Sequence, residues 1–179
     1  MKSKKFLTFF FIVINLASVN YSYSIEPDVF VQSTVNRASA ALNNKYSKEE
    51  KIEKLKQIAS ETVDIRGIGF YTLGAYRKSI SESEKKEYEI LFEKYFLKSF
   101  ASRLAEYSNP EIEVISKKKL NDNYTMVSSK LVPTEQRPEV KIDWRIYTKK
   151  PQNPLIRDLI IEGLSLARTQ KEEFSSIIQ

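Results

Sequence analysis

The chain has 179 residues, with 29 Lys and Arg, 23 Asp and Glu, and neither cysteine nor histidine. Without these two residue types there are no disulfides, no thiolate or imidazole metal sites and no nucleophile activated by a histidine, so catalysis is the minority hypothesis. The net charge is +6 for the whole chain and +3 for residues 25–179. The mildly basic balance of residues 25–179 suits contact with an anionic membrane face or an acidic partner, and it is too small to indicate nucleic-acid binding.

Residues 1–24 have the pattern of a secretory signal peptide. Lysines within residues 2–5 precede an apolar run over Phe6–Ile14, and the segment ends in the small-x-small triplet Ser22-Tyr23-Ser24. This pattern predicts export and cleavage after Ser24, with an uncleaved N-terminal anchor as the alternative. Removing the segment leaves residues 25–179 as a single domain with 26 basic and 23 acidic residues, a net charge of +3.

Helical spacing of apolar residues dominates the first half of this domain. Ser47-Lys-Glu-Glu50 and Ser81-Glu-Ser-Glu84 both fit the capping box that starts a helix. The longest predicted helix carries a wide, mostly aromatic apolar stripe, and Asn109-Pro110 lies beyond its end. The predicted helices cover residues 28–43, 47–59, 65–76 and 82–107.

From residue 111 the apolar period changes from 3.6 to two. Val140–Ile146 alternates strictly, with Val, Ile, Trp and Ile on one face and Lys, Asp and Arg on the other. Asn121-Asp122-Asn123 is a turn signal between the first two strands. The predicted strands are one beginning at Ile112, then 124–132, 140–146 and 156–162, and a closing helix covers 165–178.

This order predicts an α+β domain. The N-terminal helices and the one long helix are expected on one face of a four-stranded, mostly antiparallel sheet, followed by a closing C-terminal helix. A polar second face of that sheet explains the strict alternation in its third strand.

Three features invite a functional interpretation. The aromatic stripe of the long helix either lines an apolar cavity or is plain core. Asp143 and Asp158, on neighbouring predicted strands, are either an acid/base pair or structural carboxylates, with Asp143 facing solvent and Asp158 paired to an arginine across the sheet. The run Lys117-Lys118-Lys119 is either a solvated turn or a docking site for an acidic partner.

Several segments resemble motifs of the MlaC, or toluene-tolerance, family. Asp64–Arg77 (DIRGIGFYTLGAYR) is similar to its "D-[FI]-x…LG-x-[WY]-R" signature, and Ser81–Glu84 to the helix start that follows. Val140–Ile146 (VKIDWRI) resembles its "V-x-V-D-[YW]-R-[LM]" strand. Arg157–Leu166 (RDLIIEGLSL) resembles its "x-D-[VL]-x-[VI]-E-G-[VI]-S" junction, and Phe174 matches an aromatic of the closing helix.

The resemblance implies a soluble, monomeric periplasmic phospholipid carrier without enzymatic activity, whose partners are an inner-membrane ABC transporter complex and an outer-membrane lipoprotein complex. It implies no cofactor and no metal, only a bound phospholipid as cargo, with Arg77 near the headgroup at the cavity mouth. The residues expected to line the apolar cavity are Phe70, Leu73, Phe92, Phe96, Phe100, Leu104, Val127, Trp144, Ile146, Leu159 and Ile161.

Two other classes of function stay open on the sequence. One is a periplasmic interaction module with a filled core and no lipid cargo. The other is a hydrolase that uses Asp143 or Asp158, which predicts loss of turnover without unfolding when either is changed to Asn.

Overall fold

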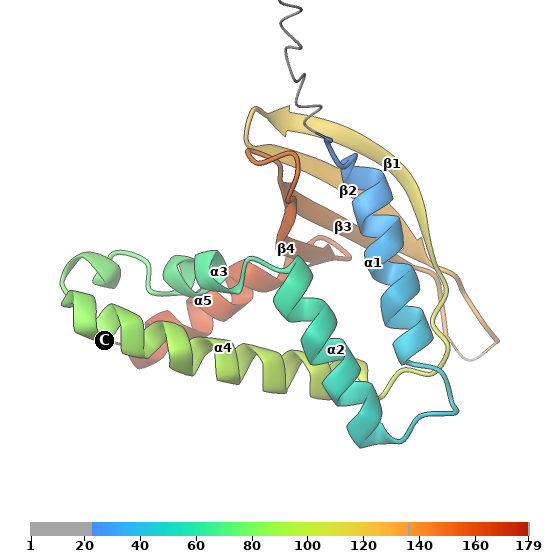
Figure 1. Cartoon of the computed structure of the whole chain (residues 1–179), viewed down its shortest axis with the longest axis horizontal. Coiled ribbons are helices and arrows are strands. Elements are labelled where there is room, and N and C mark those ends of the chain that lie inside the picture. The colour runs from blue at the N-terminus through green and yellow to red at the C-terminus, as the bar shows by residue number, and fades with distance from the viewer. Residues whose placement is uncertain (1–22, 136, 179) are drawn as a thin grey trace, which may run out of the picture.

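A five-stranded antiparallel sheet forms one side of the molecule (Figure 1). The computed structural model describes residues 23–135 and 137–178. Each strand pairs with its chain neighbours, in the order β1-β2-β3-β4-β5. The predicted fold class is confirmed, with one strand more than the four expected, because β5 pairs with β4 through only two residues. The strands are β1 (Ile112–Asn121), β2 (Tyr124–Leu131), β3 (Val140–Tyr147), β4 (Leu155–Ile161) and β5 (Leu164–Ser165).

The helices begin where the capping signals place them. Ser47 and Ser81 each accept a hydrogen bond from the amide three residues on, and Glu50 and Glu84 reach back to the cap amides, so both capping boxes are present. Ser165 caps the last helix in the same way through the amide of Arg168. The helices are α1 (Pro27–Ala41), α2 (Lys48–Thr62), α3 (Ile65–Thr72), the 3-10 turn η1 (Tyr76–Lys78), α4 (Glu82–Leu104) and α5 (Leu166–Ile177).

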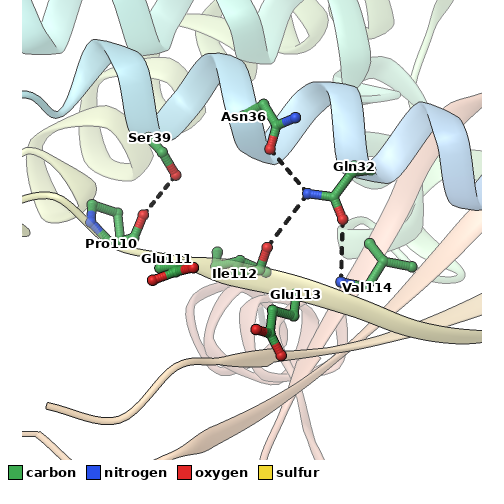
Figure 2. Close-up of a pocket in the computed structure, with 8 residues that line it drawn as sticks. All are labelled: Gln32, Asn36, Ser39, Pro110, Glu111, Ile112, Glu113 and Val114. Atoms are coloured by element: carbon green, nitrogen blue, oxygen red, sulfur yellow. Dashed lines mark hydrogen bonds between the residues drawn. The ribbon is translucent and has the colours of Figure 1, made fainter.

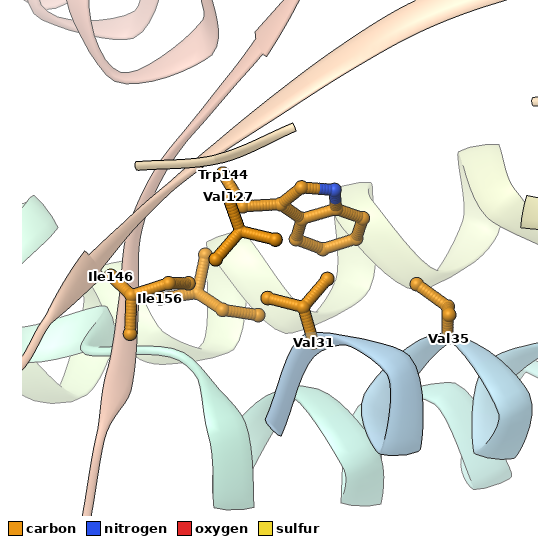
Figure 3. Packing of buried hydrophobic residues seen from close by; sticks show 6 residues of the cluster. All are labelled: Val31, Val35, Val127, Trp144, Ile146 and Ile156. Atoms are coloured by element: carbon orange, nitrogen blue, oxygen red, sulfur yellow. The ribbon is translucent and has the colours of Figure 1, made fainter. Parts of the chain in front are cut away.

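The first helix, not the longest, covers the sheet. Val31 and Val35 of α1 are almost completely buried against the inner face of β2, β3 and β4 (Figure 3). We expected α4 on this face, but α4 packs against α2 and α3 and contributes to two other apolar clusters. Helical periodicity specifies the apolar face of a helix and leaves open which element covers it. The sheet cluster consists of Val31, Val35, Val127, Trp144, Ile146 and Ile156.

The link between α2 and α3 fastens the helical layer to the sheet. Val63 forms a parallel bridge with Ile156, and the Asp64 amide donates to the Ile156 carbonyl at 2.9 Å. The Asp64 carboxylate caps α3 through the Gly67 amide at 2.8 Å and accepts from Nε of Arg157 in β4 at 2.5 Å. One carboxylate therefore caps a helix and ties it to a strand.

No helix within residues 23–135 and 137–178 is long and apolar enough to cross a membrane. The predicted signal peptide falls almost wholly on residues 1–22, which lie outside the described residues.

Candidate functional site

Four aromatic rings stack along one face of α4. Tyr88, Phe92, Phe96 and Phe100 follow each other at intervals of four residues, which brings them onto one side of a helix. The centroids of successive rings are 5.7, 6.1 and 5.4 Å apart, with interplanar angles of 27°, 28° and 12°. We call these four residues the α4 ladder.

The first half of the α4 ladder is closed by α3 and α5. Phe174 of α5 meets Phe92 edge-on, with centroids 5.9 Å apart. Gly69 of α3 lies so close that a Cβ there would be 2.8 Å from Cδ1 of Phe92. Tyr88 Oη and Thr72 Oγ1 are 2.6 Å apart, and burial raises the pKa of the Tyr88 phenol. At this end of the ladder Phe92 is buried core, and Tyr88 beside it is half-buried.

The second half of the ladder is only half-buried. Phe96, Phe100 and Leu104 of α4 keep partial solvent exposure, and so do Leu159 and Ile161 on the inner face of β4. Large apolar side chains that stay partly exposed retain contact area for an apolar ligand. We call these five residues the open apolar set; all of them belong to the predicted cavity lining.

Other predicted lining residues lie in filled core. Val127 and Ile146 are fully buried, and Trp144 is 7% exposed beneath α1. The Trp144 Nε1–H donates to Ser129 Oγ at 2.8 Å, which holds the indole against the sheet. Val63 packs against both the sheet cluster and the Phe92 cluster, so it connects the two parts of the predicted set.

The remaining predicted residues lie on α3 and the turn after it. Leu73 is buried at the C-cap of α3, and half-buried Phe70 has the Arg66 guanidinium 5.0 Å from its ring centroid. Arg77 is exposed in η1. The sequence left a second role open for Arg77, a structural salt bridge to Asp64 or to a neighbouring residue. In the structure Asp64 pairs with Arg157, and Arg77 forms no ion pair within the described residues.

Two cavities in the described residues lie away from the predicted lining. The first, of about 480 Å³, is a polar groove between α1 and β1. The Gln32 amide bridges this groove (Figure 2): its nitrogen donates to Asn36 Oδ1 at 2.9 Å, and its oxygen accepts from the Val114 amide at 3.3 Å. Gln32 thus satisfies part of the edge of β1. The second cavity, of about 450 Å³, lies between α3 and α5.

Both candidate catalytic carboxylates have structural partners. Asp158 is 4% exposed and accepts from Ser165 Oγ at 2.6 Å and from the Ala167 amide at 3.0 Å, which anchors the start of α5. Arg145 across the sheet lies 4.0 Å from it, as predicted. Asp143 accepts from Ser128 Oγ at 2.6 Å. Among the described residues no cluster of carboxylates is arranged to hold a metal ion.

The lysine run lies inside β1, and acids of the chain itself compensate most of it. Lys117 binds Glu26 at 2.5 Å and Asp28 at 2.8 Å, and Lys119 binds Asp122 at 2.8 Å. These hydrogen bonds lower the pKa of Asp28 and Asp122 and raise that of Lys117. Paired charges leave the run little capacity for docking an acidic partner.

Sequence reasoning missed the contacts that join distant segments. Arg157 and Asp64 are 93 residues apart, and no local pattern links them. The role of Ser129 was equally hidden, because a polar residue at an inward position of a strand carries no sign of its partner. The contact of Phe174 did have a signal, since it is the one aromatic residue of the helix Leu166–Ile177.

Comparison with known proteins gives a family and a fold. The family model described as "MlaC protein" matches residues 32–179. A solved structure of a phospholipid-binding protein from Ralstonia solanacearum, in complex with a phospholipid, has a TM-score of 0.71 to this chain, covering 86% of this chain and 88% of that one. The two sequences are 18% identical, so the likeness concerns the fold.

Proposed function

This chain belongs to the MlaC protein family, and from that premise we propose that it is a phospholipid carrier. It takes up one phospholipid, encloses the acyl chains between the helical layer and the sheet, and leaves the headgroup near the surface. The phospholipid present in the Ralstonia solanacearum protein of the same fold supports the nature of the cargo.

The open apolar set is the observation that carries this proposal. The sheet cluster and Phe92 are buried, whereas Phe96, Phe100, Leu104, Leu159 and Ile161 keep partial solvent exposure at the borders of the core clusters. Acyl chains laid on these side chains complete their burial. Trp144 is a neighbour of one member of this set, because it pairs across the sheet with Leu159.

The energetics explain why a carrier is needed. At about 0.8 kcal/mol per buried CH₂ group, two acyl chains with roughly 30 such groups resist transfer to water by more than 20 kcal/mol. An apolar protein surface removes most of that barrier without any proton transfer. A chain without histidine and cysteine loses nothing in such a role.

The proposed setting is the periplasm. Residues 1–24 act as the signal peptide, and the mature monomer, starting at Ile25, shuttles between an inner-membrane ABC transporter complex and an outer-membrane lipoprotein complex. Mass spectrometry of the secreted protein tests this directly. Retention of residues 1–24 contradicts a freely diffusing carrier.

Substitution of one ladder residue tests the cargo site. Phe96→Asp places a carboxylate among apolar side chains, and we expect the lipid that co-purifies per protein to fall at least about tenfold. Ile90→Asp is the matched control, since Ile90 lies on the same helix and is 56% exposed. Lipid is measured by mass spectrometry, and circular dichroism confirms that both variants fold. Equal lipid in Phe96→Asp, Ile90→Asp and the parent places Phe96 outside the cargo site.

The filled sheet cluster favours a second candidate, an interaction module without cargo. Val127, Trp144 and Ile146 are packed by α1, and neither described cavity borders the open apolar set. The test is to express the whole chain with its export segment, purify the secreted protein without detergent and measure its lipid. Secreted protein that carries no lipid supports this alternative and contradicts the carrier.

A further inference from the structure

The cavity between α3 and α5 is lined mainly by charged and hydroxyl-bearing side chains of α5. Its α5 residues recur at helical spacing on one face of the helix, from Arg168 to Ser176. Phe174, which packs on the α4 ladder, points from a different side of the same helix. The cavity is therefore separate from the open apolar set. Its lining consists of Tyr71, Arg168, Lys171, Glu172, Ser175 and Ser176.

Cations and hydroxyl groups converge in this cavity. Arg168 and Lys171 supply two positive charges against the single carboxylate of Glu172. The Lys171 ammonium lies 5.2 Å from the centroid of the Tyr71 ring, and its stem runs past Gly74, where a Cβ would be in van der Waals contact with Cε at 3.4 Å. Stacking on Tyr71 holds the ammonium at the cavity, since a cation is attracted to the face of an aromatic ring.

The two cations of this cavity differ from the cations that acids of the chain itself neutralise. Lys117, Lys119 and Arg157 each bind a carboxylate within 3 Å. Within residues 23–135 and 137–178, Arg168 and Lys171 form no ion pair. The hydroxyls differ too: Ser176 donates its proton to the Glu173 carbonyl at 2.6 Å, whereas the exposed Ser175 hydroxyl makes no such bond within the described residues.

We propose that this cavity binds a phosphate group, carried either by free inorganic phosphate or by a lipid headgroup. A guanidinium donates a pair of parallel N–H groups that match two phosphate oxygens, and an ammonium adds a mobile charge. The Ser175 and Tyr71 hydroxyls donate to the remaining oxygens. Glu172 opposes the anion and keeps the affinity low, so release is fast.

Two variants, one that removes a positive charge of the cavity and one that removes its negative charge, test whether the cavity binds phosphate. The purified protein is titrated with inorganic phosphate at pH 7, with sodium chloride withdrawn to keep ionic strength constant, and amide shifts in the NMR spectrum give the dissociation constant. We expect Arg168→Gln to weaken binding about threefold to tenfold and Glu172→Gln to tighten it. The control Lys118→Gln removes an exposed charge on β1 and leaves the constant unchanged.

Vesicles identify the source of the phosphate. Phosphatidylcholine vesicles with and without phosphatidylglycerol are sedimented with the protein and with Arg168→Gln. Binding that needs phosphatidylglycerol and Arg168 assigns the site to a lipid headgroup, and phosphate shifts without vesicle binding assign it to the free ion. The proposal is overturned when neither probe binds, or when Lys118→Gln weakens binding as much as Arg168→Gln does. Each outcome is independent of the lipid content of the Phe96→Asp variant.

Discussion

The hydrogen bond between Trp144 and Ser129 provides a quantitative test of the sheet cluster. Ser129 has no solvent exposure and Trp144 is 7% exposed. Ser129→Ala removes the acceptor of the indole N–H, which stays buried without a partner. An unsatisfied buried donor costs about 1–3 kcal/mol, so we expect the free energy of unfolding to fall by about 2 kcal/mol. The Ser129 hydroxyl also donates to the Ile142 carbonyl at 3.1 Å, which adds to the loss.

Urea unfolding measures this loss, and the protein supplies its own probe. Trp144 is the single tryptophan of the chain, so its fluorescence reports the cluster directly. A double-mutant cycle with Trp144→Phe isolates the bond, since phenylalanine has no N–H to leave unpaired. Unfolding of the Trp144→Phe variants is followed by circular dichroism. In this background Ser129→Ala should lower the free energy of unfolding by at least about 1 kcal/mol less than it does in the parent. An equal cost in both backgrounds refutes the reasoning.

Three further predictions concern packing, charge and cargo. Gly69→Ala drives a Cβ into Phe92 and should destabilise the fold by about 1 kcal/mol, because overpacking outweighs the gain in helix propensity; the loss should shrink with Phe92→Leu in urea unfolding. Lys117→Met should lower the free energy of unfolding at pH 7 and should lower it less below about pH 4. The reason is that Lys117 lowers the pKa of Asp28, and this pair stabilises the fold only while the Asp28 carboxylate is ionised. A stability difference between variant and parent that is as large at pH 2 as at pH 7 contradicts this. Phospholipid with brominated acyl chains should quench Trp144, and unchanged fluorescence places the cargo elsewhere.

Local chemistry determined most of the secondary structure. Ser47 and Ser81 begin their helices because a serine followed three residues later by glutamate satisfies two otherwise free amides. The turn at Asn121-Asp122-Asn123 and the alternation of Val140–Ile146 placed β1, β2 and β3 within a few residues. The α+β fold class followed from the order of these elements, and the family resemblance rested on the motifs within them.

The extent of the predicted site was less accessible to sequence. The role of the open apolar set in binding stays a prediction, and the complete burial of Val127 and Ile146, which were predicted to line the same cavity, was not foreseen. An apolar stripe looks the same whether protein or a ligand covers it. Burial by α1 decided which part became core.

The sequence by itself determined that the chain is an α+β domain with an N-terminal export pattern, an aromatic long helix and no thiol or imidazole chemistry, since composition and periodicity are local properties. Only the tertiary structure decided that α4 packs against α2 and α3 and leaves the sheet to α1, that Asp64 reaches Arg157, and that Arg168 and Lys171 share a cavity with Tyr71. Contacts between residues distant in the chain depend on how whole helices and strands pack. Any apolar face of fitting shape can be buried against another, so the sequence of one element does not specify its partner.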